Sequence, residues 1–140
     1  MSGTWKRGLQ RLWPRPRTDI TPASTTAASG AAAEQRAAQH LEGAGLTLLA
    51  RNYRSPHGEI DLVMAHGETV VFVEVRFRTN AGFGTPAETV DARKQARLRA
   101  TAEHFLQHDR RASNRPCRFD IVAVSPAPGG DRLEWLRNAF

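Results

Sequence analysis

Hydrophobic and polar residues alternate over two adjacent stretches in the middle of the chain, residues 59–64 and 71–77. Because successive side chains of a strand point to opposite faces, this period of two predicts two β-strands. The His66-Gly67 pair between them suits a hairpin turn, since Gly accepts a positive φ. In such a hairpin Asp61 and Glu74 can face each other. Each strand would then have one face with charged residues, made of Glu59, Asp61 and Val63 on the first and of Phe72, Glu74 and Arg76 on the second.

The rest of the chain has weaker but consistent patterns. An Ala-rich segment predicts a helix, which Gly43 or Gly45 can end. A Gly- and Pro-containing stretch over 79–86 predicts a loop. With the hairpin strands, the order of elements is αβββαββ, which predicts an α/β fold with a mixed β-sheet flanked by helices. The other predicted elements are a helix over 31–42, a strand over 46–53, a helix over 87–108, a strand over 118–124 and a short strand over 133–136.

Length and composition predict a single domain without a membrane span. The chain has 140 residues, 40% of them hydrophobic, which is enough for one core. Its single cysteine, Cys117, excludes an internal disulfide framework and is expected to be a small core or strand residue. No apolar run approaches 18 residues, and no secretory signal is visible, so we expect neither a membrane segment nor secretion.

Positive charge is concentrated at the start of the chain. The formal net charge is +6, and residues 1–17 hold five basic residues and no acid. Residues 18–33 are rich in Thr, Ser, Ala and Pro, the composition of a flexible linker. We therefore predict a basic, disordered tail over 1–29 and a folded domain over 30–140. A nucleic-acid footprint is expected mainly from the tail, and a dedicated nucleic-acid or membrane arm is the alternative to simple disorder.

Two facing carboxylates need compensation. At about 4 Å they repel by roughly 4 kcal/mol at an effective dielectric near 20, so the pair must share a proton or recruit a cation. Carboxylate oxygens suit Mg²⁺ or Mn²⁺, and the sequence has no Cys or His cluster with zinc spacing. The alternative is that the two acids pair with arginines as solvated ions at the strand ends. The candidate partners for that alternative are Arg54, Arg76 and Arg78.

An Asp near the end of one strand, followed one hairpin later by Glu-Val-Arg, is similar to the PD-(D/E)xK signature of restriction-endonuclease-like nucleases. More narrowly, the chain resembles the YraN family of small bacterial proteins, which is assigned to that nuclease fold. The resemblance runs from about residue 30 to the end. Its pieces are Ala33-Glu34, Arg51-Asn52-Tyr53-Arg54, Gly58-Glu59-Ile60-Asp61-Leu62, Val71-Phe72-Val73-Glu74-Val75-Arg76, Phe83-Gly84-Thr85-Pro86, Val90 with Lys94, Arg118-Phe119-Asp120 and Asn138-Ala139-Phe140.

The resemblance implies roles for individual residues. It implies that Asp61 and Glu74 are direct metal ligands and that the carbonyl of Val75 completes the coordination. Glu34, at the start of the first helix, would be an extra acid that supports the metal, although favourable charge at a helix N-terminus explains it equally well. Glu59 is either a further ligand or a surface charge.

The chain departs from the signature at Arg76, where the pattern has Lys. An arginine stays protonated, so it can stabilise charge but cannot take a proton from water. Some members of the wider fold carry the missing lysine on the neighbouring helix, and Lys94 is the only lysine outside the tail. Gln95 beside it could orient water or a phosphate. The alternative for both is an exposed helix position without a catalytic role.

The resemblance implies an endonuclease-like domain in a bacterial cytoplasm that hydrolyses DNA phosphodiester bonds with Mg²⁺ or Mn²⁺, branched or unusual DNA included. One alternative is a non-catalytic nucleic-acid-binding or complex-assembly module on a nuclease scaffold, which Arg76 and the near-neutral domain favour. A purely structural role, with the acids in salt bridges, leaves Glu34 unexplained.

Overall fold

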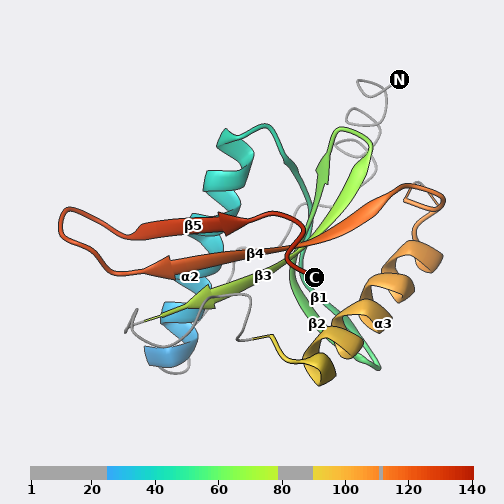
Figure 1. Ribbon diagram of the computed structural model, residues 1–140, viewed down its shortest axis with the longest axis horizontal. Helices are drawn as coiled ribbons and strands as arrows, with labels where there is room; N and C mark the ends of the chain where they lie inside the picture. The colour runs from blue at the N-terminus through green and yellow to red at the C-terminus, as the bar shows by residue number, and fades with distance from the viewer. Residues whose placement is uncertain (1–24, 79–89, 111) are drawn as a thin grey trace.

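The computed structural model describes residues 25–78, 90–110 and 112–140, with the backbone alone described for residues 25–29. Their helices and strands follow one another in the predicted order αβββαββ (Figure 1). None of the helices in these ranges is long and apolar enough to cross a membrane. The elements are α2 (Thr25–Gly43), β1 (Thr47–Ser55), β2 (Gly58–His66), β3 (Thr69–Phe77), α3 (Ala92–His108), β4 (Cys117–Ser125) and β5 (Arg132–Leu136).

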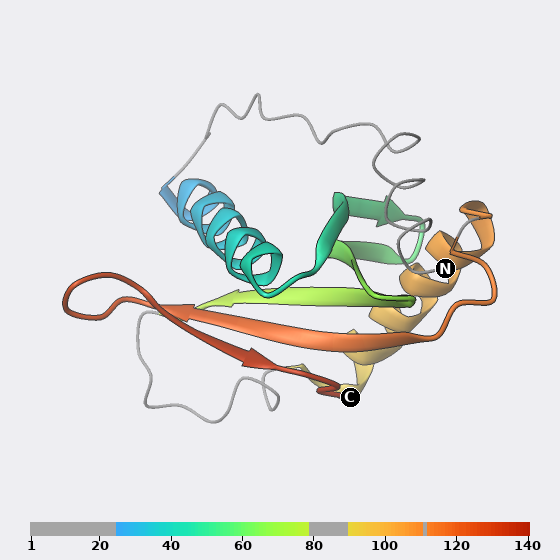
Figure 2. The same ribbon diagram turned by 90° about the horizontal axis from the view of Figure 1, so that it is seen from above.

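The strands form one sheet in the order β1-β2-β3-β4-β5. Neighbouring strands are antiparallel, except that β3 and β4 are parallel and are connected through α3. The prediction of a mixed sheet is therefore confirmed. Helices α2 and α3 lie on opposite faces of the sheet, as the view from above shows (Figure 2). The α/β class follows from this arrangement, because each helix covers one apolar face.

The central hairpin has the predicted strands with a turn shifted by one residue. His66 pairs with Thr69, so the turn residues are Gly67 and Glu68 rather than His66 and Gly67. Gly67 has a φ of 62°, the left-handed conformation that favours glycine. Leu62 pairs with Val73, and continuing this register by one residue puts Asp61 opposite Glu74. The predicted proximity of the two acids therefore follows from the hairpin register.

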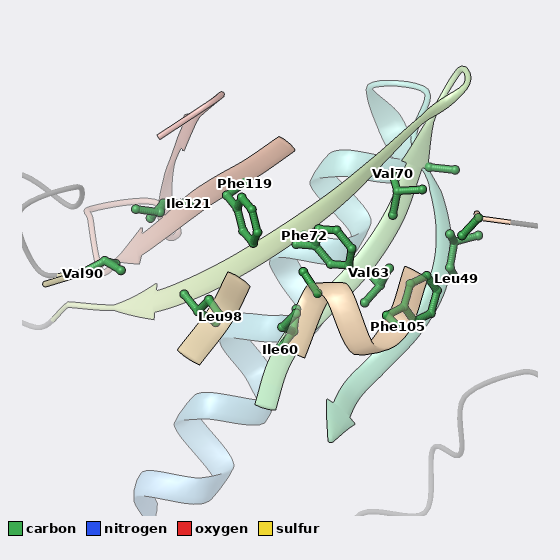
Figure 3. Close-up of a cluster of buried hydrophobic side chains, with 13 residues drawn as sticks. Leu49, Ile60, Val63, Val70, Phe72, Val90, Leu98, Phe105, Phe119 and Ile121 are labelled. Carbon is green, nitrogen blue, oxygen red and sulfur yellow. The ribbon is translucent and has the colours of Figure 1, made fainter. Parts of the chain in front are cut away.

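Alternating residues of the hairpin fill two separate cores. On the α3 side, Val63 and Phe72 pack with Leu98 and Phe105 of the helix (Figure 3). On the α2 side, Leu62, Met64, Val71 and Val73 pack with Ala37 and Leu41. This confirms the predicted separation of Val63 from Leu62 and Met64. Ile60 departs from it, since Ile60 packs in the α3-side core together with Val63.

Both helices begin at positions that periodicity did not predict. Helix α2 begins at Thr25, six residues early and inside the predicted linker, where alanines favour a helix. Helix α3 begins at Ala92 rather than 87, because Asp91 caps it and accepts a hydrogen bond from the Lys94 backbone N at 2.8 Å. The predicted loop over 79–86 and residues 1–24 of the predicted tail over 1–29 lie outside the described residues. Cys117 begins β4 and is exposed, which agrees with a strand residue but not with a core residue.

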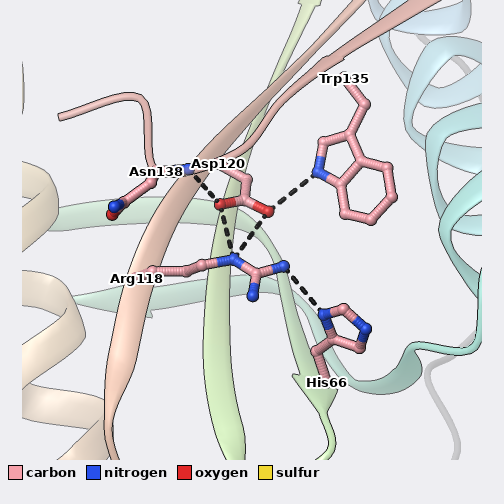
Figure 4. Close-up of polar contacts among 5 residues, drawn as sticks. All are labelled: His66, Arg118, Asp120, Trp135 and Asn138. Atoms are coloured by element: carbon pink, nitrogen blue, oxygen red, sulfur yellow. Dashed lines mark hydrogen bonds and ion pairs between the residues drawn. The ribbon is translucent and has the colours of Figure 1, made fainter.

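A buried carboxylate ties the end of the chain to the sheet (Figure 4). Asp120 on β4 is fully buried and accepts hydrogen bonds from Trp135 Nε1 and the Asn138 backbone N, both at 2.9 Å. Arg118 Nε also donates to it, at 3.0 Å, and Arg118 Nη2 lies 3.1 Å from His66 Nδ1. These hydrogen-bond donors replace the water that the buried carboxylate has lost. The motif residues Arg118, Asp120 and Asn138 thus have a structural role.

Candidate functional site

Asp61 is held at the junction of β2 and β3. Its Oδ2 accepts a hydrogen bond from the Val75 backbone N at 2.8 Å, which fixes the carboxylate against the neighbouring strand. The pKa of Asp61 is raised to about 8. Burial is the largest cause, and the hydrogen bond and the charge interaction with Glu74 are the next. The Val75 N–H opposes this shift because it stabilises the charged form. Asp61 therefore strongly favours either a proton or a nearby cation.

Glu74 is the more buried acid of the pair, with 5% of its surface exposed, whereas Asp61 is partly buried. The Lys94 ammonium forms an ion pair with Glu74 Oε2, and Arg76 Nε lies 3.6 Å from the same oxygen. Lys94 lies in the first turn of α3, where its backbone N–H donates to the Asp91 cap. The structure thus brings together four residues that the sequence predicted for the site: Asp61, Glu74, Arg76 and Lys94.

Two further acids meet through a residue to which the sequence interpretation assigned no role. With the Asn52 amide nitrogen directed at the carboxylates, it donates to Glu34 Oε2 and to Glu59 Oε1, each at 3.0 Å. Asn52 has a φ of 49° inside β1, a conformation that Asn tolerates better than most residues. An Asn within a strand pattern was the available signal, because Asn is disfavoured in regular strands.

The four acids form one electrostatic group. Burial, then the charge of Glu59, raises the pKa of Glu34, and Glu74 adds to the effect, while Arg51 opposes it. Glu34 in turn raises the pKa of Asp61. Because the neighbouring carboxylates disfavour ionisation of Glu34 and Asp61, a positive charge at this group would stabilise their charged forms.

The remaining predicted site residues have other contacts. Glu59 also pairs with Arg54 Nε at 3.2 Å on the exposed side of the sheet. The Gln95 amide donates to the Val90 carbonyl at 3.0 Å, which holds the segment before α3 in place. The expected roles of Glu59 as a ligand, of Gln95 in orienting water and of the Val75 carbonyl in coordination stay predictions.

The acidic group offers a limited set of oxygen ligands to a hard divalent cation. In the described part of the chain, no group of three or more Asp, Glu, His or Cys side chains gathers in an arrangement for binding a metal. Mg²⁺ commonly uses only one or two protein carboxylates and keeps several waters. The pair of Asp61, which is partly buried, and Glu74, which is buried, meets that smaller requirement, and its need for positive charge fits a cation. The alternative of solvated salt bridges at the strand ends does not apply to Glu74, since its side chain is buried.

The family profile that this chain matches and the similar proteins named below belong to the same family. Residues 33–124 match the profile of UPF0102, described as an uncharacterised protein family. A UPF0102 protein of Pseudomonas entomophila (strain L48) is 51% identical over 120 residues, covering 85% of this chain and 98% of the relative. One of Pseudomonas putida (strain GB-1) has the same identity and coverage. One of Stutzerimonas stutzeri (strain A1501) is 51% identical over 118 residues, covering 84% and 98%.

Proposed function

The chain belongs to UPF0102, the YraN family, whose description names no activity, and we propose that it is a metal-dependent enzyme that hydrolyses phosphodiester bonds in DNA. The observation that carries the proposal is the Asp61–Glu74 pair, in which Glu74 is buried and Asp61 partly buried, with Lys94 directed at Glu74. Lys94 and Arg76 compensate the charge of Glu74, whereas the pKa of Asp61 stays raised. A divalent ion beside Asp61 would relieve this cost, which a purely structural ion pair at Glu74 leaves in place.

Each residue of the pair and its surroundings would have a distinct task. A divalent ion bound by Asp61 and Glu74 would supply Lewis acidity and a water of lowered pKa. The Val75 N–H holds Asp61 in one orientation, so the carboxylate needs little reorganisation. Lys94 and Arg76 supply positive charge where a phosphate would lie beside Glu74. Arg76 would act only by charge, because a guanidinium stays protonated near neutral pH and cannot take a proton from water.

Support for a nucleic-acid substrate comes from the charge of the chain. The net charge of +6 favours a polyanion, and five basic residues in positions 1–17 could contact a phosphate backbone. Such contacts would position a substrate without reading its sequence. DNA is the proposed substrate class, with branched structures among those to be tested.

The test uses isosteric variants of the two acids. The full chain is incubated with single-stranded, duplex and branched DNA and with single-stranded RNA, in Mg²⁺ or Mn²⁺ and with a chelator as control. The double variant Asp61→Asn, Glu74→Gln should lose cleavage. Glu68→Gln should keep it, since Glu68 is an exposed acid at the other end of the same hairpin. Absence of cleavage by wild type with both metals, or equal cleavage by the double variant, would refute the proposal.

A second candidate function has an observation of its own. Glu74 Oε2 already has Lys94 and Arg76 beside it, so the chain can compensate this charge without a metal. A non-catalytic nucleic-acid-binding or complex-assembly module would retain such a self-compensated site. Binding of the same DNA substrates without any cleavage, unchanged by metal and by the double variant, would favour this function.

A further inference from the structure

The Lys94 ammonium contacts one of the two carboxylate oxygens with which Glu74 could bind a metal. It contacts Glu74 Oε2, and Glu74 is the more buried member of the carboxylate pair, since its side chain is 6% exposed. The other acid, Asp61, directs Oδ2 to the Val75 backbone N. A cation shared between Asp61 and Glu74 would therefore meet Lys94 at its position of contact with Glu74.

The side chain of Lys94 has the freedom to move away from Glu74, while its backbone stays in place. Its backbone is anchored, because its N–H donates to the Asp91 cap at 2.8 Å and its residue lies in the first turn of α3. Its side chain is 31% exposed, and a lysine stem has several rotatable bonds. The ammonium can therefore move toward solvent while the helix stays in place. Asp61 has no comparable freedom, because the strand pairing and the Val75 N–H hold it.

We infer that Lys94 is the internal counter-ion of Glu74 and competes with the divalent cation for Glu74 Oε2. Binding of the cation releases the Lys94 ammonium, which is then available to a phosphate group beside the site. This competition lowers the metal affinity of the free protein and couples metal loading to the placement of Lys94. The inference rests on the proposed metal site and adds a regulation of that site.

The first test compares metal affinities of matched variants by titration calorimetry with Mg²⁺ and with Mn²⁺. Lys94→Met removes the competing ammonium and keeps a flexible stem of similar length. Arg93→Met is the control, since it removes one positive charge from the adjacent, exposed position of the same helical turn. Removing a contact charge should strengthen metal binding on the order of tenfold or more, whereas the control should change it by less than about threefold.

The outcomes separate the inference from the proposed function. Tighter binding in Lys94→Met alone supports the competition, as does binding in Lys94→Met when wild type shows none. Equal affinities in Lys94→Met and Arg93→Met, or weaker binding in Lys94→Met, overturn the competition and leave the metal site standing. No binding in any of the three proteins overturns the proposed function and the inference together.

A second test uses wild-type protein, so it does not depend on the folding of a variant. The chain has two lysines, Lys6 and Lys94, and reductive methylation with ¹³C labels both, together with the N-terminal amine, while preserving their charge. A Lys6→Arg sample identifies the Lys6 signal, and the N-terminal amine is identified by its lower pKa, which leaves the Lys94 signal. Saturating Mg²⁺ should shift the Lys94 methyl resonance and leave that of Lys6 unchanged. A Lys94 resonance that does not respond to Mg²⁺, in a protein whose melting temperature does, would overturn the inference.

Discussion

Replacing Asp61 with Asn tests whether the acidic pair is costly to the fold. Asn keeps the size of the side chain and an oxygen that can accept the hydrogen bond from the Val75 N–H, but it cannot ionise. Burial, followed by the contact with Glu74, raises the pKa of Asp61 from its ordinary 3.8 to about 8. The folded protein therefore keeps a proton on this group at a pH where the unfolded chain has lost it.

The sign and size of the difference in stability between Asp61→Asn and wild type follow from proton linkage. Below about pH 4 both states are protonated, and the stability contributed by the protonated group is fully present. As the pH rises from there through about 8, the unfolded state releases its proton first, so stability is lost. The loss is complete above the folded pKa, and its upper limit is on the order of 5 kcal/mol for a pKa displaced this far. Asp61→Asn removes this loss. Its advantage over wild type should therefore grow from near zero at low pH to several kcal/mol at high pH.

Urea unfolding of wild type and Asp61→Asn near pH 5, 7 and 9, without divalent ions, measures the effect. Glu68→Gln serves as the control, because Glu68 is exposed and its substitution should give a small difference that hardly changes with pH. Millimolar Mg²⁺ should narrow the gap at high pH by stabilising wild type alone. A difference between Asp61→Asn and wild type that is the same at all three pH values would refute the reasoning.

Three other predictions concern neighbouring features. Asn52→Ala and Asn114→Ala both place Ala at a positive φ, but only Asn52 also bridges two carboxylates, so urea unfolding should show an extra loss of about 1 kcal/mol for Asn52→Ala; equal losses would contradict the bridge. In single-turnover assays at saturating metal, Lys94→Ala should lower the cleavage rate on the order of 100-fold and more than Arg76→Lys does, because Lys at position 76 restores the usual group; full activity of Lys94→Ala would eliminate its role in the chemistry. Deleting residues 1–24 should flatten the salt dependence of DNA affinity, measured by fluorescence anisotropy, by up to about 4.5 log units per log unit of salt, while an unchanged slope would locate the footprint elsewhere.

Local pattern was enough to predict most of the strands, and the helix boundaries show where it fails. The period-two alternation of the central hairpin predicted both strands, because strand geometry follows from neighbouring residues alone. The opposition of Asp61 and Glu74 depends on the turn at Gly67 and Glu68, since a turn at His66 and Gly67 would put Phe72 opposite Asp61. The predicted start of α3 was five residues too early. The helix begins where Asp91 caps it, and this cap does not change the hydrophobic pattern from which the start was predicted. The turn was misplaced by one residue because Gly67 can occupy either position of a hairpin loop.

By itself, then, the sequence determined the class of fold, the order of its elements, the acidic pair and the family, all of which depend on local periodicity or on motifs in order. Only the tertiary structure decided that Lys94 reaches Glu74, that Asn52 joins Glu34 to Glu59, and that Gln95 turns to the Val90 carbonyl. These contacts join residues from different elements or select one partner among several within reach. Their distances and burial depend on how the helices pack on the sheet, and no local pattern contains that information.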